Sequence, residues 1–173
     1  MIFKRVRAGT VCVIGEELCG FRQDRGCMDQ VFAIRQVCEK YSIANGKIVF
    51  RAFMDLEKAY DTIDWHGMWQ ILRVREVEGK LLKAMQSFHV DSRACVRVGN
   101  DMSEWFPVDV GLGQDCVMSP WWFSVYMGGV VREVNANVLG KGQELLRVSG
   151  GFEINQLLFA DNTKQVADSE EKL

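Results

Sequence analysis

Apolar residues recur at helical spacing in the first half of the chain. Residues 27–41 predict an amphipathic helix that ends at the Asn-Gly pair 45–46, and its periodic positions are Met28, Val31, Phe32, Val37, Cys38 and Tyr41. Two shorter helices are predicted over residues 65–77 and 80–89, on either side of Gly79. Their inward faces are expected to be Met68, Trp69, Leu72, Leu81, Leu82, Met85 and Phe88.

A longer helical pattern lies in the second half of the chain. Ser119 and Pro120 predict its start, because serine caps helix N-termini and proline fits the first turn. The pattern runs to about Val134. Gly128 and Gly129 in its middle should weaken the helix by about 1 kcal/mol per glycine relative to alanine.

Other stretches have the pattern of β-strands. Residues 47–55 form an apolar run that predicts a buried strand. Alternation in residues 94–98 and 104–108 predicts a β-hairpin, because the Gly-Asn-Asp segment between them tolerates positive φ. A second hairpin is predicted from the apolar strand that ends at residue 160 and a shorter strand over residues 163–167.

Aspartates stand at the ends of two of these apolar segments. Asp55 ends the first predicted strand, and Asp161 with Asn162 forms the predicted tip of the second hairpin. Two-metal phosphoryl-transfer sites need carboxylate oxygens where buried strands meet solvent. The two aspartates would therefore hold magnesium ions if the fold brings them together. Taken singly, each is more typical of a solvated turn or a helix N-cap.

Length and composition are those of one globular domain. The chain has 173 residues, of which 48% are hydrophobic and 25% charged, with only two prolines. Its apolar runs are shorter than the roughly 18 residues that a membrane span needs, and its start lacks the apolar stretch of a signal peptide, so we expect an intracellular protein. The net charge of −2 argues against a stand-alone nucleic-acid binder, which usually has a basic excess.

The cysteines do not form a metal-binding pattern. None of the six cysteines has the CxxC spacing of zinc ligands, and the chain contains only two histidines. We therefore expect reduced and mostly buried thiols.

Four segments, in order, carry a resemblance to one family. Residues 20–27 (GFRQDRGC) resemble its GFR.GR segment, and residues 52–61 (AFMDLEKAYD) resemble its first catalytic motif. Residues 113–120 (GQDCVMSP) resemble its QGxxxSP motif, and residues 159–162 (FADN) resemble its (Y/F)ADD box. From about Gly20 to its end, the chain is similar to the reverse transcriptase (RNA-directed DNA polymerase) domain of non-LTR retrotransposons, as a partial and mutated copy.

The resemblance implies an α+β fold. A right-hand polymerase palm with part of the fingers is expected, in which an antiparallel sheet is backed by helices. Residues 20–173 would form this partial domain, and residues 1–19 have no match. We expect the thumb to be absent, because the chain ends two residues after a helix-start signal at residues 168–171, as in a truncated copy.

The resemblance also implies a reaction. A primer 3′-hydroxyl would attack the α-phosphate of a deoxynucleoside triphosphate on an RNA template, with two Mg²⁺ (or Mn²⁺) ions as cofactors. Asp55, Asp161 and Asn162 match the catalytic positions. The two aspartates would hold the ions, and the backbone carbonyl of Leu56 would assist.

Further positions match the family's nucleotide and template contacts. Tyr60 matches the aromatic residue that excludes a ribose 2′-hydroxyl, although an ordinary core tyrosine is the alternative. The motif that lines the nucleotide pocket is matched by Gln114, Ser119 and Pro120. The template-binding cations of the fingers are matched by Arg22 and Arg25, for which a solvated loop is the alternative.

The chain departs from the family pattern at several of these positions. Asn162 replaces the second aspartate of the box, and an amide supplies one neutral oxygen in place of a charged carboxylate. Gly113 stands where a basic residue is common, and Asp115 stands at a glycine position beside the nucleotide pocket. Asp24 places another acid in the template-binding segment. These changes predict weak or absent catalysis.

Three hypotheses follow from the sequence. The chain is an impaired RNA-directed DNA polymerase, a non-catalytic nucleic-acid-binding palm, or a functionless relic of a retroelement. The binding hypothesis rests on cations that also fit a solvated face, namely Arg22, Arg25, Arg73, Arg75, Lys80, Lys83, Arg93 and Arg97. The sequence does not decide between a nuclear and a cytoplasmic location, and it leaves the oligomeric state open.

Overall fold

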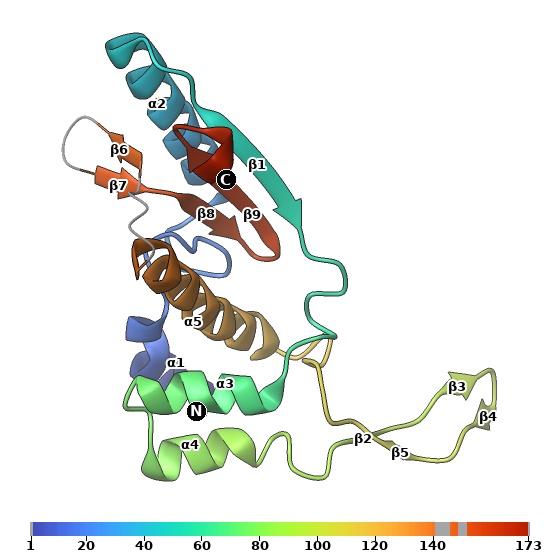
Figure 1. The fold of residues 1–173 in the computed structure, drawn as a ribbon. Helices are drawn as coiled ribbons and strands as arrows, with labels where there is room; N and C mark the ends of the chain where they lie inside the picture. Colours follow the sequence, from blue (N-terminus) through green and yellow to red (C-terminus); the bar gives the residue numbers. More distant parts are fainter. Residues whose placement is uncertain (1, 141–145, 149–151, 173) are drawn as a thin grey trace. The chain divides into compact units, whose positions relative to one another are not determined.

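The computed structural model describes residues 2–140, 146–148 and 152–172 (Figure 1). The chain folds as two compact units, and each takes up two separate stretches of sequence. Unit 1 consists of Met1–Val13 and Lys58–Tyr126, and unit 2 consists of Ile14–Glu57 and Met127–Leu173. None of the described helices has the length and apolar character that crossing a membrane requires.

Unit 2 contains a three-stranded antiparallel sheet with the order β1-β9-β8 (Figure 1). Its strands are β1 (Phe50–Asp55), β8 (Gln156–Phe159) and β9 (Asn162–Ala167). The β8 strand is buried as predicted, whereas Phe53 and Met54 of β1 are 66% and 42% exposed. The prediction of a buried strand is therefore wrong for β1. The physical reason is packing: β8 lies against α2 and the loop of residues 17–19, whereas Phe53 and Met54, on opposite faces of β1, are left largely uncovered.

Helix α2 (Cys27–Asn45) confirms the first predicted helix. The Asp29 carboxylate accepts a 2.7 Å hydrogen bond from the Gly26 N–H at its start, and Gly46 ends it with φ of 62°. Its buried face agrees with the prediction in part: Val37 and Tyr41 are buried, whereas Met28, Val31 and Phe32 are exposed. The buried positions are Gln30, Ile34, Val37 and Tyr41. An apolar pattern that is wide enough to suit two helix faces did not reveal which face packs.

A small core joins α2 to the strands of unit 2. Val37 and Tyr41 of α2 pack with Leu146 and with Val166 of β9. Leu146 begins β6 (Leu146–Val148), which pairs antiparallel with β7 (Phe152–Ile154). The chain's last described element is the short 3₁₀ helix η2 (Glu170–Lys172), at the predicted helix-start signal.

Unit 1 is mainly helical. Its helices are α1 (Ile2–Thr10), the 3₁₀ turn η1 (Val11–Val13), α3 (Trp65–Val74), α4 (Gly79–Gln86) and the first turns of α5 (Ser119–Gly140). Asp64 caps α3, since its carboxylate accepts from the backbone N–H groups of His66 and Gly67. The predicted inward residues Met68, Leu72, Leu82 and Met85 are buried, whereas Phe88 is 49% exposed.

Helix α1 is anchored in the core of unit 1 by a buried hydroxyl. Thr10 Oγ1 donates to the Val6 carbonyl at 2.8 Å and accepts from Trp121 Nε1 at 2.7 Å. Thr10 is fully buried and Trp121 is nearly so, so both polar groups are satisfied inside the core. Helix α5 runs through Gly128 and Gly129 and ends six residues beyond the predicted end.

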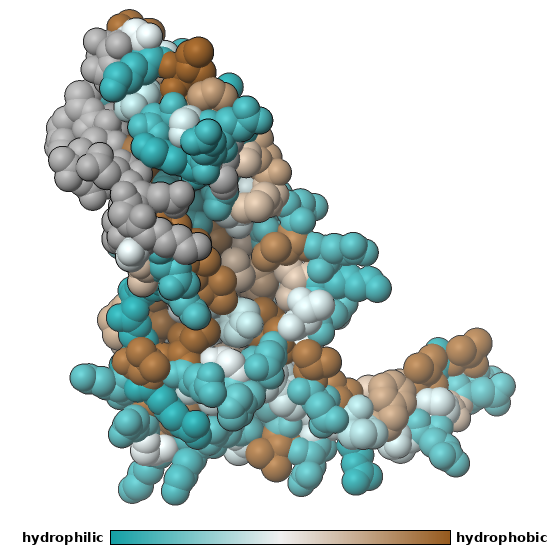
Figure 2. Space-filling view, in the orientation of Figure 1, coloured by the Kyte–Doolittle hydropathy of each residue, from teal (hydrophilic) through white to brown (hydrophobic). Residues whose placement is uncertain are grey.

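The predicted hairpin in residues 94–108 is confirmed, as two short ladders. β2 (Arg93–Ala94) pairs with β5 (Phe106–Pro107), and β3 (Arg97–Val98) pairs with β4 (Asp101–Met102) around a turn where Gly99 has φ of 62°. Apolar side chains are exposed along this hairpin (Figure 2), namely Val96, Val98, Met102, Trp105 and Phe106.

Candidate active site

The sheet of unit 2 brings the two predicted carboxylates to one end. In the β1–β9 ladder, Asp55 stands directly opposite Asn162, and in the β8–β9 ladder Phe159 also pairs with Asn162. Ala160 and Asp161 thus form a two-residue turn, and Ala160 has a positive φ of 53°. The predicted tip was Asp161 with Asn162. The structure corrects this by one residue, because Asn162 is already the first residue of β9.

These polar groups are accessible to solvent. Asp55 and Asn162 are exposed, and Asp161 is half-buried. Asn162 Nδ2 donates to Asp161 Oδ1 at 3.3 Å. The amide therefore acts as a donor toward the neighbouring carboxylate and occupies one of its lone pairs, whereas an aspartate at this position would only accept.

The donor set fits a hard divalent cation. Asp55 and Asp161 offer carboxylate oxygens at adjacent strand ends, and the Leu56 carbonyl follows directly in the chain. Among the described residues, no group of three or more His, Cys, Asp or Glu side chains lies close enough to hold a metal ion. An oxygen-only set of two carboxylates suits Mg²⁺ or Mn²⁺ with water ligands, and it does not suit Zn²⁺.

The predicted nucleotide contacts Tyr60, Gln114, Ser119 and Pro120 lie in unit 1, around the loop that precedes α5. The Leu112 N–H donates to the Tyr60 carbonyl at 2.8 Å, and the Gly111 N–H donates to the Ile63 carbonyl at 2.9 Å. Gly111 has φ of 87°, and a Cβ there would lie 2.9 Å from the Asp61 carbonyl oxygen. Only glycine permits this close approach. The segment containing Tyr60 and the loop containing Gln114 are thus tied together.

Tyr60 has a fixed ring orientation. Its ring stacks on Phe123 of α5, with centroids 4.8 Å apart and planes 6° from parallel. Phe123 is fully buried and Tyr60 is half-buried, so one face of the tyrosine is covered by the core. The arrangement positions a rigid aromatic ring at the edge of unit 1.

The loop itself is held by Ser119. Its Oγ donates to the Gly113 carbonyl at 2.7 Å, and its N–H donates to the Cys116 carbonyl at 3.1 Å. Ser119 is buried, whereas Gln114 is exposed. The Pro120 carbonyl accepts from Ser124 Oγ at 3.0 Å inside the first turn of α5. Of the three motif residues, Gln114 alone presents its side chain freely.

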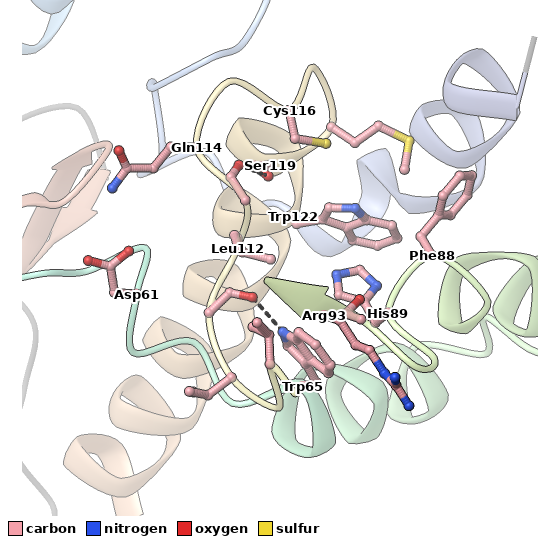
Figure 3. A pocket seen from close by; sticks show the side chains of 16 residues that line it. Asp61, Trp65, Phe88, His89, Arg93, Leu112, Gln114, Cys116, Ser119 and Trp122 are labelled. Atoms are coloured by element: carbon pink, nitrogen blue, oxygen red, sulfur yellow. Dashed lines mark hydrogen bonds between the residues drawn. The ribbon is translucent and has the colours of Figure 1, made fainter. Parts of the chain in front are cut away.

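A cavity of about 580 Å³ opens beside this loop (Figure 3). The rings of Trp65, Phe88, His89 and Trp122 gather on one side of the view, with Asp61 and Gln114 on the other. Trp65 Nε1 donates to the Gly111 carbonyl at 2.5 Å. The sequence offered only spaced aromatic residues as a signal, and the prediction did not find this cavity.

His89 and Cys116 are two of the titratable residues that line the cavity. Burial among tryptophan rings lowers the pKa of His89, whose centroid lies 4.8 Å from that of Trp65. Burial raises the pKa of the Cys116 thiol, but hydrogen bonds from Met118 and Ser119 outweigh it and leave the pKa below its usual value. The prediction of mostly buried thiols is wrong, since Cys12, Cys27 and Cys116 are exposed, although no cysteine forms a disulfide.

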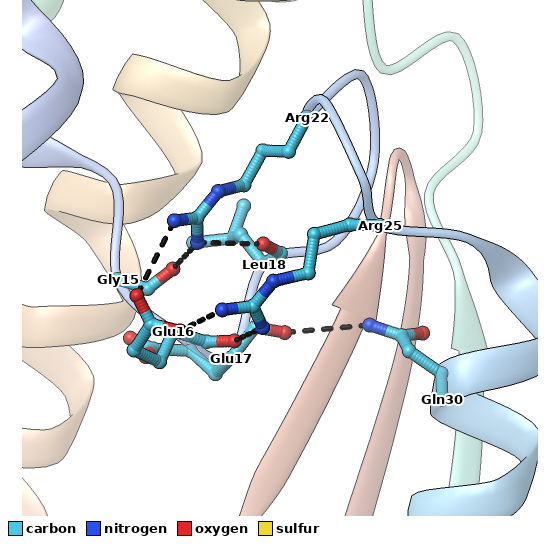
Figure 4. A network of polar contacts seen from close by, with 7 residues as sticks. All are labelled: Gly15, Glu16, Glu17, Leu18, Arg22, Arg25 and Gln30. Atoms are coloured by element: carbon cyan, nitrogen blue, oxygen red, sulfur yellow. Dashed lines mark hydrogen bonds and ion pairs between the residues drawn. The ribbon is translucent and has the colours of Figure 1, made fainter.

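Arg22 and Arg25 fold back onto their own loop in unit 2 (Figure 4). Arg22 donates to the carbonyls of Gly15 at 2.8 Å and Leu18 at 3.2 Å, and it pairs with the Glu16 carboxylate at 3.3 Å. Arg25 pairs with the other Glu16 oxygen. Hydrogen bonds from Arg25, and then from Arg22, lower the pKa of Glu16.

These features lead to the comparison with known proteins. The sequence matches the family described as "Reverse transcriptase (RNA-dependent DNA polymerase)" over residues 1–173. The chain belongs to the reverse transcriptase family.

Solved structures similar to this reverse transcriptase chain include two yeast telomerases. Apo telomerase from Candida tropicalis, truncated from its C-terminal domain, matches with a TM-score of 0.72 and 9% identity, over 99% of this chain and 34% of that one. Telomerase from Candida albicans in complex with a TWJ fragment of telomeric RNA matches with a TM-score of 0.71 and 11% identity, over 99% and 31%. The predicted α+β palm and fingers fold is confirmed. The chain spans about a third of the length of these proteins.

Two departures from the motif patterns lie at positions with a left-handed backbone. Asp24 and Asp115 stand where the GFR.GR and QGxxxSP patterns have glycine, and their φ values are 59° and 62°. Both are left-handed conformations that glycine adopts freely and aspartate adopts at some cost. The loops therefore keep a shape suited to glycine after glycine has been replaced.

Proposed function

We propose that the chain carries the polymerase centre of a non-LTR retrotransposon reverse transcriptase, with nucleotidyl transfer weakened by Asn162. The observation that carries the proposal is the β1–β9 register, which sets Asp55 opposite Asn162 and therefore one residue from Asp161. The four ordered motifs support the non-LTR type. The expected substrates are an RNA template, a DNA primer and deoxynucleoside triphosphates.

Asp55 and Asp161 would hold two Mg²⁺ or Mn²⁺ ions, with the Leu56 carbonyl as a further oxygen ligand. When bound, such ions activate the primer 3′-hydroxyl and stabilise the departing pyrophosphate. Asn162 weakens the site in two ways. It contributes no negative charge, and its amide hydrogen bond competes for the Asp161 oxygen that an ion would need.

The residues of unit 1 would act on the nucleotide in different ways. Tyr60, held by its stack on Phe123, would exclude a ribose 2′-hydroxyl by its bulk. Gln114 is exposed and would hydrogen-bond the nucleotide. Ser119 and Pro120 would act indirectly, because their polar atoms already hold the loop and the first turn of α5.

Template binding would involve Arg22 and Arg25. Both guanidinium groups are paired with Glu16, whose side chain is 74% exposed, so a template phosphate would take the place of an exposed carboxylate. One similar telomerase structure is a complex with a fragment of telomeric RNA, which supports RNA as the partner. The Glu16→Gln variant should bind RNA more tightly, because it removes the competing charge.

Primer extension on an RNA template tests the proposed reaction. The chain, its Asn162→Asp variant and an Asp55→Asn/Asn162→Asp double variant are compared with Mg²⁺ and with Mn²⁺. We expect Asn162→Asp to raise the rate by about a thousand-fold, because a lost metal-coordinating charge costs several kcal/mol of transition-state stabilisation. The double variant should be inactive. Equal activity of the chain and Asn162→Asp would refute the role given to Asn162.

A second candidate function is nucleic-acid binding without catalysis. The six unit 1 cations of the sequence-based hypothesis are all exposed, namely Arg73, Arg75, Lys80, Lys83, Arg93 and Arg97. Electrostatic binding of an RNA–DNA hybrid would weaken steeply with salt. This function predicts that Asp55→Asn leaves hybrid binding intact and that primer extension is absent even in Asn162→Asp.

A further inference from the structure

The β8 strand is held on both sides, although it is only four residues long. On one side it pairs with β9. On the other side the Leu158 N–H donates to the Glu17 carbonyl at 2.9 Å, and the Leu158 carbonyl accepts from the Cys19 N–H at 3.0 Å. Leu18 and Leu158 thus form an isolated parallel bridge. Both bonds on this second side involve Leu158, three positions before Asp161.

Gln30 adds a side-chain bond to the same carbonyl. Its Nε2 donates to the Leu158 carbonyl. It also donates, at 3.4 Å, to the Glu17 carbonyl (Figure 4). Gln30 is 1% exposed and stands in the first turns of α2. The Leu158 carbonyl therefore has two donors, one from the Cys19 backbone and one from the α2 side chain.

A buried glutamine at this position is not explained by core stability alone. Gln30 Oε1 is buried and has no hydrogen-bond partner among the described residues. An unpaired buried acceptor costs about 1–3 kcal/mol, which an apolar side chain of the same volume would avoid. The amide leaves one buried acceptor unpaired, and its donor binds the strand that leads to Asp161.

The same loop also supports the turn itself. A Cβ on Gly20 would lie 2.5 Å from the Ala160 nitrogen, so the two backbones touch. Ala160 has a φ of 53°, which is unfavourable for alanine and needs external support. Arg22 in turn fixes the loop by its bonds to Gly15 and Leu18.

We propose that Gln30 is a positioning residue for Asp161. Together with the backbone of residues 17–20 it forms a clamp that holds Leu158 and Ala160, and so fixes the turn that carries the carboxylate. This role rests on the proposed polymerase function. A displacement of about 1 Å at a reacting centre can lower a rate by about 10²-fold, so a turn of strained residues on a short strand needs such support.

Hydrogen exchange tests the clamp without any assay of polymerisation. In the unmodified chain, the Cys19 amide should exchange as slowly as the β8–β9 ladder amides, although Cys19 lies in a loop. Fast exchange of Cys19, like that of the exposed loop residues 21–25, would overturn the proposal whatever any variant does.

Two glutamine variants complete the test. Gln30→Met keeps the volume and removes the donor, so the amides of residues 158–162 should exchange at least tenfold faster, while the β6–β7 amides do not change. Gln36→Met is the matched control. Gln36 lies on the same helix, and its side-chain amide donates to the Glu39 carboxylate at 3.4 Å. Unchanged exchange at residues 158–162 in Gln30→Met would refute the clamp.

Kinetics then separate a positioning role from a merely structural one. In the Asn162→Asp background, Gln30→Met should lower kcat for primer extension about 10²-fold and leave the KM for the nucleotide unchanged. A rise in KM at constant kcat would contradict the positioning role. Faster exchange in Gln30→Met, together with no extension by any variant, would support the clamp and refute the polymerase function.

Discussion

Asp55 and Asn162 are direct partners in the β1–β9 ladder, and Asn162 also pairs with Phe159 across the adjacent turn. A single residue thus joins the strand of one carboxylate to the turn of the other. The amide donates to Asp161 at 3.3 Å, so the site has two negative charges where the family pattern has three. The first prediction concerns that missing charge.

Asn162→Asp should bind Mn²⁺ about tenfold more tightly than the unmodified chain. One added charge at contact distance from a divalent ion contributes about 1–2 kcal/mol in a solvent-exposed site. Titration with Mn²⁺ followed by electron paramagnetic resonance measures the affinity. Asn100→Asp, at the exposed hairpin tip of unit 1, is the control and should not change it. Equal affinities for all three proteins would contradict a metal site at Asp55 and Asp161.

Asp115→Gly should stabilise unit 1, and Asp24→Gly should stabilise unit 2, by about 1 kcal/mol each. Both residues have a left-handed backbone, which glycine adopts without strain. Urea denaturation measures the change. Asp109→Gly is the control, because Asp109 has no positive φ, and there glycine should destabilise slightly. A loss of stability in Asp115→Gly would show that the aspartate side chain stabilises the loop.

Gly20→Ala should destabilise the chain by about 1–3 kcal/mol, because the new methyl group would lie 2.5 Å from the Ala160 nitrogen. The Leu158 hydrogen bonds with Glu17 and Cys19 hold the two segments together beside this contact. Gly26→Ala is the control, since its Cβ would lie 3.7 Å from the nearest atom, an ordinary contact. Thermal melts of both variants give the comparison, and equal melting temperatures would disprove the close approach.

Glu16 should make the stability of the folded chain depend on pH in the acidic range. Its folded pKa is lowered, mainly by the Arg25 hydrogen bond, so its contribution is present above the unfolded value of 4.5 and is lost as pH falls through the folded pKa. Urea midpoints measured between about pH 3 and pH 6 should fall more steeply in the unmodified chain than in Glu16→Gln. Parallel curves of urea midpoint against pH for the two proteins would mean that Glu16 does not pair with Arg22 and Arg25 in solution.

His89 should give a second pH dependence, at higher pH. Burial lowers its folded pKa below 6.5, so the unfolded chain takes up a proton first as pH falls. Stability is therefore full above pH 6.5 and declines as pH falls from there toward the folded pKa. His89→Phe, which keeps an aromatic ring beside Trp65 and Trp69, should lack this decline. An imidazole titration by NMR with a midpoint above 6.5 would contradict the burial.

The elements of this fold are visible in the sequence because their patterns are local. The helix over α2, the hairpin around Gly99 and the strand β8 follow from spacing, turn residues and caps in one stretch of chain. Whether a side chain is buried or exposed depends on what packs against it. Phe53 and Met28 have the residue types of a core, yet both are exposed, Phe53 on a largely uncovered stretch of β1 and Met28 away from the buried positions of α2.

The candidate site likewise has parts that the sequence predicts and parts that it does not. The positions of Asp55 at a strand end and Asp161 in the neighbouring turn could be predicted, because a carboxylate after an apolar run is a short-range signal, whereas their role rests on the four ordered motifs and stays a prediction. The cavity beside Gln114 and the bond from Gln30 to Leu158 could not, since they join segments far apart in sequence. A buried glutamine in a helix pattern resembles any polar position until its partner strand is known.

The glycines of this chain differ in how much space surrounds them. Asp24 and Asp115 are exposed, so their side chains replaced the family's glycine hydrogen without touching a neighbour, at the cost of backbone strain alone. Gly20 and Gly111 lie against other backbone segments and leave no room for a methyl group. A gene copy under weak selection would lose glycines at exposed positions early. It would lose glycines packed against other backbone segments only together with the fold. Gly20 and Gly111 therefore mark close backbone contacts, whereas Gly46, Gly79 and Gly99 have open space around them and mark left-handed turns alone.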